Sequence, residues 1–456
     1  MRLSLDTVAQ FAGGCLKNVQ NAFVTSVTTD TREIKEGSLF VALKGEKFDG
    51  HDFAADAVKK GAVAVLSQRD ADEYTEALPL VVVEDTYKAL LSLAAGYRAS
   101  LEMSVVGITG SVGKTTTKDM IAAVLSAAVK TGKTQGNFNN HIGVPRTIFS
   151  LSSEDKAAVI EMGMNHAGEI SALTRVVRPD IAVITNIGVS HIEYLKTRQN
   201  ILEAKLEILE SMAGDAPLII NADNDILGGI YELDEHRIIR CSAEGNDAFV
   251  TATDICESLS GSSFKIYVGG HYLTEAFVPA VGMHNVQNAL LAAAVGIVMG
   301  LSGEQIKKGL FSYVPSGMRQ KITECAGMTF IEDCYNASPT SMVASLDVLA
   351  TLKKTRAVAV LGDMLELGDI SDEEHIKVGQ YAAEKCDLVL CQGDAAKKMH
   401  KAAKDSGTKS LWFENREDTI AFLVNELQDG DCVLFKASNS MGFGKIVESL
   451  HSKLGE

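Results

Sequence analysis

The stretch GITGSVGKTTTKDM, residues 107–120, decides the fold of this chain. The apolar run MSVVGI that precedes it predicts a buried strand, and KTTTKDMIAAVLSAAV, which follows, carries apolar residues at helical spacing. A glycine-rich turn between a strand and the N-terminus of a helix offers free backbone N–H groups to a phosphate. The stretch therefore predicts a nucleotide-binding loop.

The residue types inside this loop suit phosphate chemistry. Gly110 and Gly113 allow the backbone to approach phosphate closely, and Lys114 can reach the β- and γ-phosphates. Thr115 would place its hydroxyl on Mg²⁺. The general pattern G-x-x-x-x-G-K-[ST] is not fully met, because Ile108 occupies the place of its first glycine. The alternative is an ordinary glycine-rich turn with a solvated lysine, but strand, loop and helix context together favour a P-loop.

Length and composition bound the remaining possibilities. The chain has 456 residues, so two or three domains are expected, and no apolar run is long enough to predict a transmembrane helix. Its beginning lacks the pattern of a secretory signal. Eight cysteines without a CxxC pair indicate reduced core residues of a cytoplasmic protein. A formal net charge of −16 argues against a general nucleic-acid or anionic-membrane binder.

The pattern of strands and helices predicts three α/β domains. Residues 1–98 form a small mixed α/β unit, and residues 99–313 alternate strands with helices, which indicates a mostly parallel sheet. Residues 314–456 repeat that alternation and predict a second doubly wound domain. Ligands collect at the carboxyl ends of the strands of such sheets, which suggests a cleft between the domain at 99–313 and the domain at 314–456.

Three residues outside the loop are candidates for chemistry. Glu161 ends the predicted strand in AAVIEMGMN and could be the second acid on the metal, although a surface glutamate is an equal alternative. His191, in TNIGVSHIEYL, follows another strand, and a structural histidine is again an equal alternative. Lys205 lies within the helical pattern ILEAKLEILE, and by itself it would be interpreted as solvated.

Two further motifs carry polar groups near predicted helix starts. Asn285 and Asn288 lie on one face of a helix that begins at GMHNVQNALL; they could read an adenine edge, but capping is favoured on spacing alone. In EDCYNASPTSM, Asp333, Tyr335 and Asn336 could hold a ribose, or they could serve only as turn residues.

The loops of the first unit concentrate charge. Arg32, Lys44, Asp49 and His51 all fall within TTDTREIKEGSLFVALKGEKFDGHDF. Such a set suits a second phosphate-bearing ligand, and a solvated loop surface is the alternative.

These motifs together resemble the Mur ligase family, the ATP-dependent amide-forming enzymes of bacterial peptidoglycan synthesis. GITGSVGKTTTK, GNFNNHIGVP, EMGMNHAGEI, TNIGVSHIE, GMHNVQNAL and YNASPTSM follow one another in the family's order, and the resemblance covers nearly the whole chain. It implies a UDP-substrate-binding domain at 1–98, a P-loop ATPase domain at 99–313 and a Rossmann-like domain at 314–456.

The resemblance also implies an activity with its cofactors and partners. DCYNASPTSM followed by VLGDMLELG is similar to the member that joins D-alanyl-D-alanine to UDP-N-acetylmuramoyl-tripeptide, with ATP and Mg²⁺ as cofactors and an acyl phosphate as intermediate. A cytoplasmic monomer that binds no nucleic acid is expected. The tripeptide's third residue could be lysine or diaminopimelate, and both stay open.

Site residues carry over from the resemblance position by position. Lys114, Lys205 and His191 become catalytic. Thr115 and Glu161 would hold one Mg²⁺ and His191 a second, with Lys205, as a carbamate, a further metal ligand. The remaining expected contacts form three groups. ATP is expected to contact Thr109, Gly110, Ser111, Val112, Gly113, Lys114, Thr115, Thr116, Asn285, Asn288, Arg319, Asp333, Tyr335 and Asn336; the UDP substrate Asp30, Thr31, Arg32, Lys44, Asp49, Gly50 and His51; and the acceptor or the dipeptide Asn137, Asn139 and Asn140.

The sequence departs from the family pattern at a few positions. His141 stands where an acidic residue is expected, Thr31 replaces a serine, and the expected K-G-S-R is Lys436, Ala437, Ser438 and Asn439. The last change puts in doubt how the C-terminal domain supplies positive charge. The D-N-P-R motif of the tripeptide-forming sibling does not occur, and the DGHDF segment is unlike folylpolyglutamate synthase. A sibling that adds one amino acid and a non-catalytic nucleotide switch are the rival hypotheses.

Overall fold

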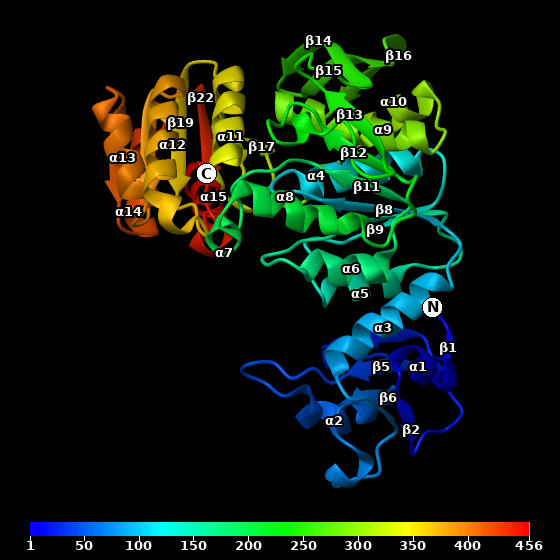
Figure 1. The fold of residues 1–456 in the computed structure, drawn as a ribbon. Helices are drawn as coiled ribbons and strands as arrows, with labels where there is room; N and C mark the ends of the chain where they lie inside the picture. The colour runs from blue at the N-terminus through cyan, green and yellow to red at the C-terminus, as the bar shows by residue number, and fades with distance from the viewer. Residues whose placement is uncertain (456) are drawn as a thin grey trace. The chain divides into compact units, whose positions relative to one another are not determined.

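The computed structural model describes residues 1–455, and Figure 1 labels its helices and strands. The N-terminal part holds a five-stranded sheet in the order β2-β7-β6-β5-β4, in which only β2 pairs antiparallel. A separate antiparallel pair joins β1 to β3. The elements are β1 (Leu3–Ser4), α1 (Leu5–Ala12), β2 (Cys15–Lys17), β3 (Phe23–Val24), β4 (Ser26–Thr28), β5 (Ser38–Val41), η1 (Gly50–Phe53), α2 (Ala54–Lys59), β6 (Ala62–Ser67), η2 (Ala71–Glu73), β7 (Leu80–Val82) and α3 (Thr86–Ala99).

The central part begins with the strand that leads into the P-loop. Strand β10 pairs parallel with β8 on one side and β9 on the other, and β14, β15 and β16 form antiparallel hairpins. The elements are β8 (Ser104–Thr109), α4 (Lys114–Ser126), β9 (Thr131–Lys133), α5 (Gly143–Ser150), β10 (Ala157–Glu161), α6 (Glu169–Val177), β11 (Ile181–Ile184), α7 (Ile192–Leu195), α8 (Arg198–Leu206), η3 (Glu207–Leu209), β12 (Pro217–Asn221), η4 (Leu227–Gly229), β13 (Arg237–Ser242), β14 (Val250–Ser258), β15 (Gly261–Val268), β16 (His271–Val278), α9 (Met283–Val298) and α10 (Gly303–Phe311).

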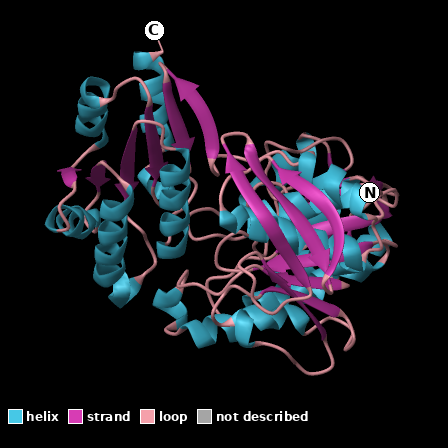
Figure 2. Cartoon of the chain, turned by 90° about the horizontal axis from the view of Figure 1, so that it is seen from above, coloured by secondary structure: helices cyan, strands magenta, loops and turns pink. Residues whose placement is uncertain are grey.

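The C-terminal part is a doubly wound sheet of six strands in the order β17-β18-β22-β19-β20-β21. Only β17 runs antiparallel to its neighbour, and Figure 2 shows helices on both sides of this sheet. The elements are β17 (Lys321–Cys325), β18 (Met328–Glu332), α11 (Pro339–Leu352), β19 (Arg356–Gly362), η5 (Gly368–Ile370), α12 (Ser371–Lys385), β20 (Leu388–Gln392), α13 (Ala396–Asp405), β21 (Lys409–Phe413), α14 (Arg416–Glu426), β22 (Asp431–Lys436), η6 (Asn439–Met441) and α15 (Gly444–Leu454).

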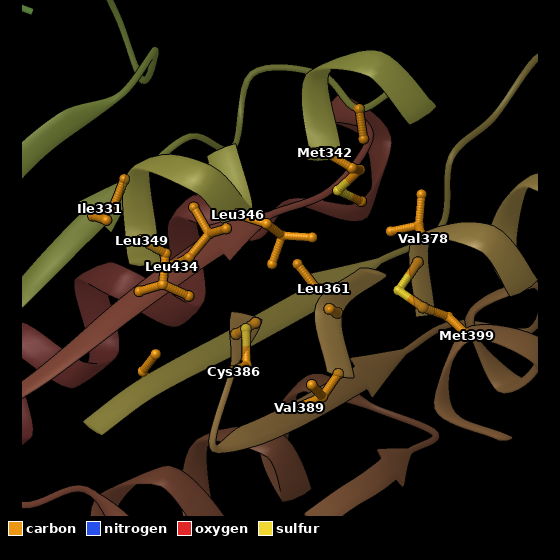
Figure 3. Close-up of a cluster of buried hydrophobic side chains, with 14 of the residues drawn as sticks. Ile331, Met342, Leu346, Leu349, Leu361, Val378, Cys386, Val389, Met399 and Leu434 are labelled. Atoms are coloured by element: carbon orange, nitrogen blue, oxygen red, sulfur yellow. The ribbon is translucent and has the colours of Figure 1, made fainter. Parts of the chain in front are cut away.

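Two apolar clusters cover the two faces of the C-terminal sheet. On one face, Leu361 of β19 and Leu434 of β22 pack with side chains of α11, α12 and α13, such as Met342, Val378 and Met399 (Figure 3). On the other face, aromatic and aliphatic side chains of the same strands pack against α14 and α15. Because the strands are buried on both faces, their sequences are continuous apolar runs rather than alternating ones.

Contacts divide the described chain into two compact units. The first comprises Met1–Thr109, Val129–Ala182 and Leu206–Pro217, and the second comprises Gly110–Ala128, Val183–Lys205 and the described residues from Leu218 onward. The predicted domain boundaries at residues 98 and 313 stay predictions.

The α/β fold class and the predicted strand and helix order are confirmed. No helix among residues 1–455 is long and apolar enough to cross a membrane. The cysteine prediction is wrong in part, because Cys15 and Cys256 are exposed while the other six are buried. Cys15 belongs to the edge strand β2 and Cys256 to the polar end of the β14 hairpin, and in both places side chains alternate between partly buried and exposed.

Candidate functional site

The P-loop is a tight turn that only glycine can build. Strand β8 ends at Thr109, and helix α4 begins at Lys114 after a left-handed residue at Gly113, whose φ is 83°. Gly110 has a φ of 149°, and a Cβ on it would stand 1.9 Å from Oγ1 of Thr185. The predicted strand–loop–helix arrangement is therefore confirmed, and the backbone of this loop is packed against the segment that follows β11.

The loop backbone is held by its neighbours as well as open to a ligand. The N–H of Ser111 donates to the carbonyl of Asn186 over 3.0 Å, and the N–H of Val112 donates to Oδ1 of Asn186 over 2.8 Å. Oγ of Ser111 accepts from the N–H of Gly188 over 2.9 Å. The N–H groups of Ser111 and Val112 therefore hold the loop in shape and are not free for a phosphate.

Lys114 begins helix α4, and two threonines, Thr115 and Thr116, follow it. Nζ of Lys114 donates to the carbonyls of Gly110 and Ser111 over 2.7 and 3.2 Å, so the side chain folds back over the loop. Thr115 is 6% exposed, and Thr116 hydrogen-bonds the hydroxyl of Tyr313. A phosphate near Lys114 would offer its ammonium an anionic acceptor in place of two neutral carbonyls, which is a stronger hydrogen bond.

Lys205 is the least ordinary residue of this region. Its side chain is 1% exposed, so the interpretation as a solvated helix lysine is wrong. Burial, reinforced by the positive charge of Lys114, lowers the pKa of Lys205 well below that of a free lysine. A neutral amine buried beside the P-loop lysine can act as a nucleophile toward a small electrophile, whereas a charged ammonium cannot.

Glu161 is buried at the end of β10, in the compact unit that includes Val129–Ala182. It is 1% exposed, and its Oε1 accepts from Nδ2 of Asn139 over 2.9 Å. Oδ1 of Asn140 accepts from the N–H groups of Ile142 and Gly143, which fixes the entry into α5. The structure therefore brings Asn139 to the candidate metal ligand and gives Asn140 a local backbone role, while Asn137 is exposed.

His191 contacts an acid that sequence reasoning did not identify. Its Nδ1 lies 2.7 Å from Oε2 of Glu366, which belongs to the segment that follows β19. The contact with His191 lowers the pKa of Glu366 below that of a free glutamate.

The two asparagines at the start of α9 do not cap it. The N-cap residue is Gly282 and no side chain bonds the cap, so the favoured interpretation from spacing is wrong. Nδ2 of Asn285 instead donates to the carbonyl of Val281 and to Oε1 of Gln320. Oδ1 of Asn288 accepts from Oγ1 of Thr117 over 3.0 Å and faces the P-loop, since a Cβ on Gly113 would stand 2.9 Å from it.

The carboxylate of Asp333 is the centre of a buried network. Its Oδ2 accepts from Nζ of Lys436 over 2.6 Å and from Oγ of Ser345 over 2.7 Å, while Oδ1 accepts from the N–H of Gln320. Nζ of Lys436 also donates to the carbonyl of Asn336 over 3.1 Å. Burial would raise the pKa of Asp333, but the charge and hydrogen bond of Lys436 prevail and lower it. This network holds the turn that carries the predicted ribose contacts.

Lys436→Met is expected to lower the free energy of unfolding of the C-terminal part by about 3–5 kcal/mol, because it leaves a buried carboxylate without its partner. Trp412, the only tryptophan, lies on β21 and reports this part by fluorescence during urea unfolding. Lys353→Met is the matched control, since Lys353 pairs with Asp387 at a site where both side chains are more than a third exposed. An equal loss of unfolding free energy in both variants would contradict the role of Lys436 as the partner of the buried Asp333 carboxylate.

Two predicted nucleotide contacts pack on each other. The guanidinium carbon of Arg319 lies 3.6 Å from the ring centroid of Tyr335, a cation–π contact. Arg319 precedes Gln320 and therefore lies next to the network of Asp333. The structure thus gathers Arg319, Tyr335, Asp333 and Asn285 around the segment that precedes β17.

The first charged loop of the N-terminal part presents an arginine. Arg32 forms a bidentate pair with Asp30, with separations of 2.6–3.0 Å, and 87% of its side chain is exposed. The hydrogen bond from Arg32 lowers the pKa of Asp30 to about 2. The carboxylate holds the guanidinium outward, where it remains open to an anion. Thr31 between them is partly buried.

His51 is held from both sides of its ring. Its Nδ1 lies 2.6 Å from Oδ1 of Asp49, and its Nε2 accepts from the N–H of Gln68 over 3.0 Å. Burial would raise the pKa of Asp49, but hydrogen bonds from His51 and Arg69 outweigh it and lower the pKa to about 2. The imidazole therefore has no ring nitrogen to offer a ligand. Arg69, which donates to Asp49, was not among the residues that the sequence analysis identified.

The neighbouring predicted contacts of this loop are backbone features. Residues Lys44 and Asp49 pair as an isolated antiparallel bridge, and the N–H of Gly50 donates to the carbonyl of Leu43 over 2.8 Å. A Cβ on Gly50 would stand 2.7 Å from that carbonyl oxygen. The loop 44–51 is therefore a closed turn whose shape needs glycine at that position.

Comparison with protein families matches three successive parts of the chain. Residues 23–98 are similar to "Mur ligase family, catalytic domain", residues 108–296 to "Mur ligase middle domain", and residues 318–439 to "Mur ligase, glutamate ligase domain". The three matches follow the order that the motifs predict.

Individual proteins are similar over nearly the full length. A Bacillus subtilis protein named UDP-N-acetylmuramoyl-tripeptide–D-alanyl-D-alanine ligase is 37% identical, covering 99% of this chain and 98% of its own length. A crystal structure of MurF from Acinetobacter baumannii superposes with a TM-score of 0.91 at 32% identity, covering 99% of both chains. A Thermotoga maritima MurF ligase in complex with ADP has a TM-score of 0.84 at 26% identity, covering 94% of this chain and 97% of that one.

Proposed function

Because this chain belongs to the Mur ligase family, we propose that it joins D-alanyl-D-alanine to UDP-N-acetylmuramoyl-tripeptide, with conversion of ATP to ADP and phosphate. The observation that carries this proposal is the likeness, over nearly the whole chain, to relatives and structures that bear this ligase name. The P-loop supports the use of ATP, as does a relative crystallised with ADP.

The chemistry that the site must support is activation of a carboxylate. A carboxylate is a poor electrophile, because it is anionic and has no good leaving group. Transfer of the γ-phosphoryl group of ATP onto one carboxylate oxygen gives an acyl phosphate and ADP. The amine of the dipeptide then attacks the carbonyl carbon, and phosphate leaves with that oxygen while the amine loses a proton. Lys114 would stabilise the charge on the transferring phosphoryl group.

A divalent cation fits the donor set of this chain if Lys205 is modified. Within residues 1–455, no three His, Cys, Asp or Glu side chains gather to hold a metal ion. Reaction of the neutral Nζ of Lys205 with CO₂ forms a carbamate and releases a proton. The carbamate offers an anionic oxygen ligand, suited to Mg²⁺, in place of the amine. As the family resemblance implies, Thr115 and Glu161 would hold one Mg²⁺ and His191 a second, and this carbamate would supply the further anionic ligand. When bound, Mg²⁺ neutralises charge on the phosphates.

The proposal is tested by a coupled assay with a panel of acceptors and amines. The purified chain, ATP and Mg²⁺ are combined with lysine- or diaminopimelate-containing UDP-muramoyl tripeptides and with D-alanyl-D-alanine or single amino acids. Mass spectrometry of the products should show amide formation with the dipeptide. Amide formation with single amino acids only would favour the sibling ligase, and no amide at all would favour a nucleotide switch. The cytoplasmic location and the monomeric state stay predictions.

Arg32→Ala is expected to weaken binding of the UDP-linked acceptor by about 10–100-fold, the effect of losing a charge-assisted hydrogen bond to phosphate. Its guanidinium is exposed and already oriented by Asp30. Isothermal titration calorimetry with the acceptor and, separately, with ATP gives the two affinities, and ATP affinity should not change. Arg2→Ala removes another exposed arginine of the same part and should leave both affinities unchanged. An equal fall in ATP affinity would contradict the assignment of this loop.

A further inference from the structure

The segment after β19 brings one carboxylate to His191. Oε2 of Glu366 lies 2.7 Å from Nδ1 of His191, and the two side chains are 45% and 20% exposed. Nδ1 itself is buried, and no side chain in the described residues meets hydrogen-bond geometry with it, so the Glu366 carboxylate at ion-pair distance is its charged neighbour. The orientation of the imidazole therefore depends on a single side chain that is distant in the sequence.

The backbone on both sides of this contact is strained. His191 has a φ of 65° and Glu366 a φ of 62°, in the left-handed region that residues with a Cβ rarely adopt. Such residues persist where the surroundings over-determine them, and they cluster at functional sites. Gly368 also has positive φ, and a Cβ on it would stand 3.3 Å from Cα of Glu193. The segment 366–368 thus lies directly against the start of α7, which carries His191 at its N-terminus.

We propose that Glu366 is a positioning residue for His191, whose carboxylate holds Nδ1 so that Nε2 is the nitrogen left for a metal ion. A carboxylate that holds a metal-binding histidine fixes the tautomer and ring orientation, and its loss costs about 10–100-fold in metal affinity. His191 follows β11 in the central part and Glu366 follows β19 in the C-terminal part. The orientation of the His191 imidazole is therefore fixed only while these two segments pack together. Metal binding by His191 is thereby coupled to the packing of segment 366–368. This inference rests on the metal role of His191 in the proposed function.

The test compares Glu366→Gln and Glu366→Asp with a matched control, Glu373→Gln. Glu373 is an exposed acid of the neighbouring helix α12 that pairs with Lys377. Binding of Mn²⁺ in the presence of ADP is followed by electron paramagnetic resonance. We expect affinity to fall about tenfold or more in Glu366→Gln, to recover in part in Glu366→Asp, and to stay unchanged in Glu373→Gln. The Mg²⁺ concentration for half-maximal turnover should rise in parallel, with the KM for the UDP-linked acceptor unchanged.

Two further measurements keep the inference open to refutation if the glutamine variant does not fold. Gly368→Ala leaves Glu366 intact but strains the backbone at a φ of 53° and crowds Glu193, and it should weaken Mn²⁺ binding in the same direction. Nitrogen-15 spectra of wild-type His191 should show a protonated Nδ1. Wild-type Mn²⁺ affinity in Glu366→Gln, or a proton on Nε2 instead of Nδ1 in the wild type, would overturn the inference. Failure of the wild type to form an amide would instead refute the proposed function.

Discussion

Lys205→Ala is expected to abolish ligation almost completely while the protein stays folded. In the proposed mechanism Lys205 becomes a carbamate that supplies anionic oxygen to Mg²⁺, and alanine has no atom that can replace it. The lysine is 1% exposed, and burial with the charge of Lys114 lowers its pKa, so the neutral amine needed for reaction with CO₂ is favoured. Turnover is measured as amide formed, and folding as the thermal transition of the variant.

The control for this loss is Lys307→Ala, which removes an exposed helix lysine from α10 and should leave turnover unchanged. A small carboxylic acid added to Lys205→Ala should restore part of the activity by occupying the vacated space. Carbon-13 spectra of the wild type in labelled bicarbonate should show a carbamate signal that the alanine variant lacks. Normal ligation by Lys205→Ala would show that this buried lysine has a structural role only.

Lys114→Ala should lower turnover by about 10²–10³-fold or more at saturating ATP, the scale of losing one contact to developing charge. In the structure its Nζ donates to two loop carbonyls, and a γ-phosphate would give it an anionic acceptor in their place. The side chain is only partly buried, so its loss should leave the fold intact. Single-turnover kinetics separate phosphoryl transfer from product release.

Affinity for the UDP-linked acceptor is the internal control, because Lys114 lies far in the sequence from the loop that carries Arg32. That affinity should match the wild type in Lys114→Ala. Turnover within a factor of about two of the wild type would be inconsistent with a P-loop lysine that acts on the transferring phosphoryl group.

The sequence predicted well those features whose cause is local. A strand, a glycine turn and a helix follow from the order of residue types between 104 and 126, and the structure confirms all three. The alternation of apolar runs with amphipathic helices likewise predicted the doubly wound sheet of the C-terminal part. Both signals arise from hydrogen-bonding geometry and periodicity within one segment.

Features that depend on tertiary contacts were not accessible in this way. Lys205 lies in a helix whose pattern does not distinguish a solvated face from a covered one, and only packing makes it buried. The contact between His191 and Glu366 joins segments distant in the sequence, and neither residue type signals a left-handed backbone. His51 has the chemistry of a ligand, yet Asp49 and the backbone of Gln68 occupy both of its ring nitrogens.

The most direct measurement of the central claim follows a heavy oxygen isotope. The tripeptide's reacting carboxylate is labelled with oxygen-18, and the wild-type chain is incubated with this acceptor, ATP, Mg²⁺ and D-alanyl-D-alanine. Activation as an acyl phosphate predicts that labelled oxygen appears in the released phosphate in step with amide formation, because phosphate leaves with the oxygen that attacked the γ-phosphorus. Phosphate without label, or phosphate released at the same rate when the dipeptide is omitted, would contradict the account.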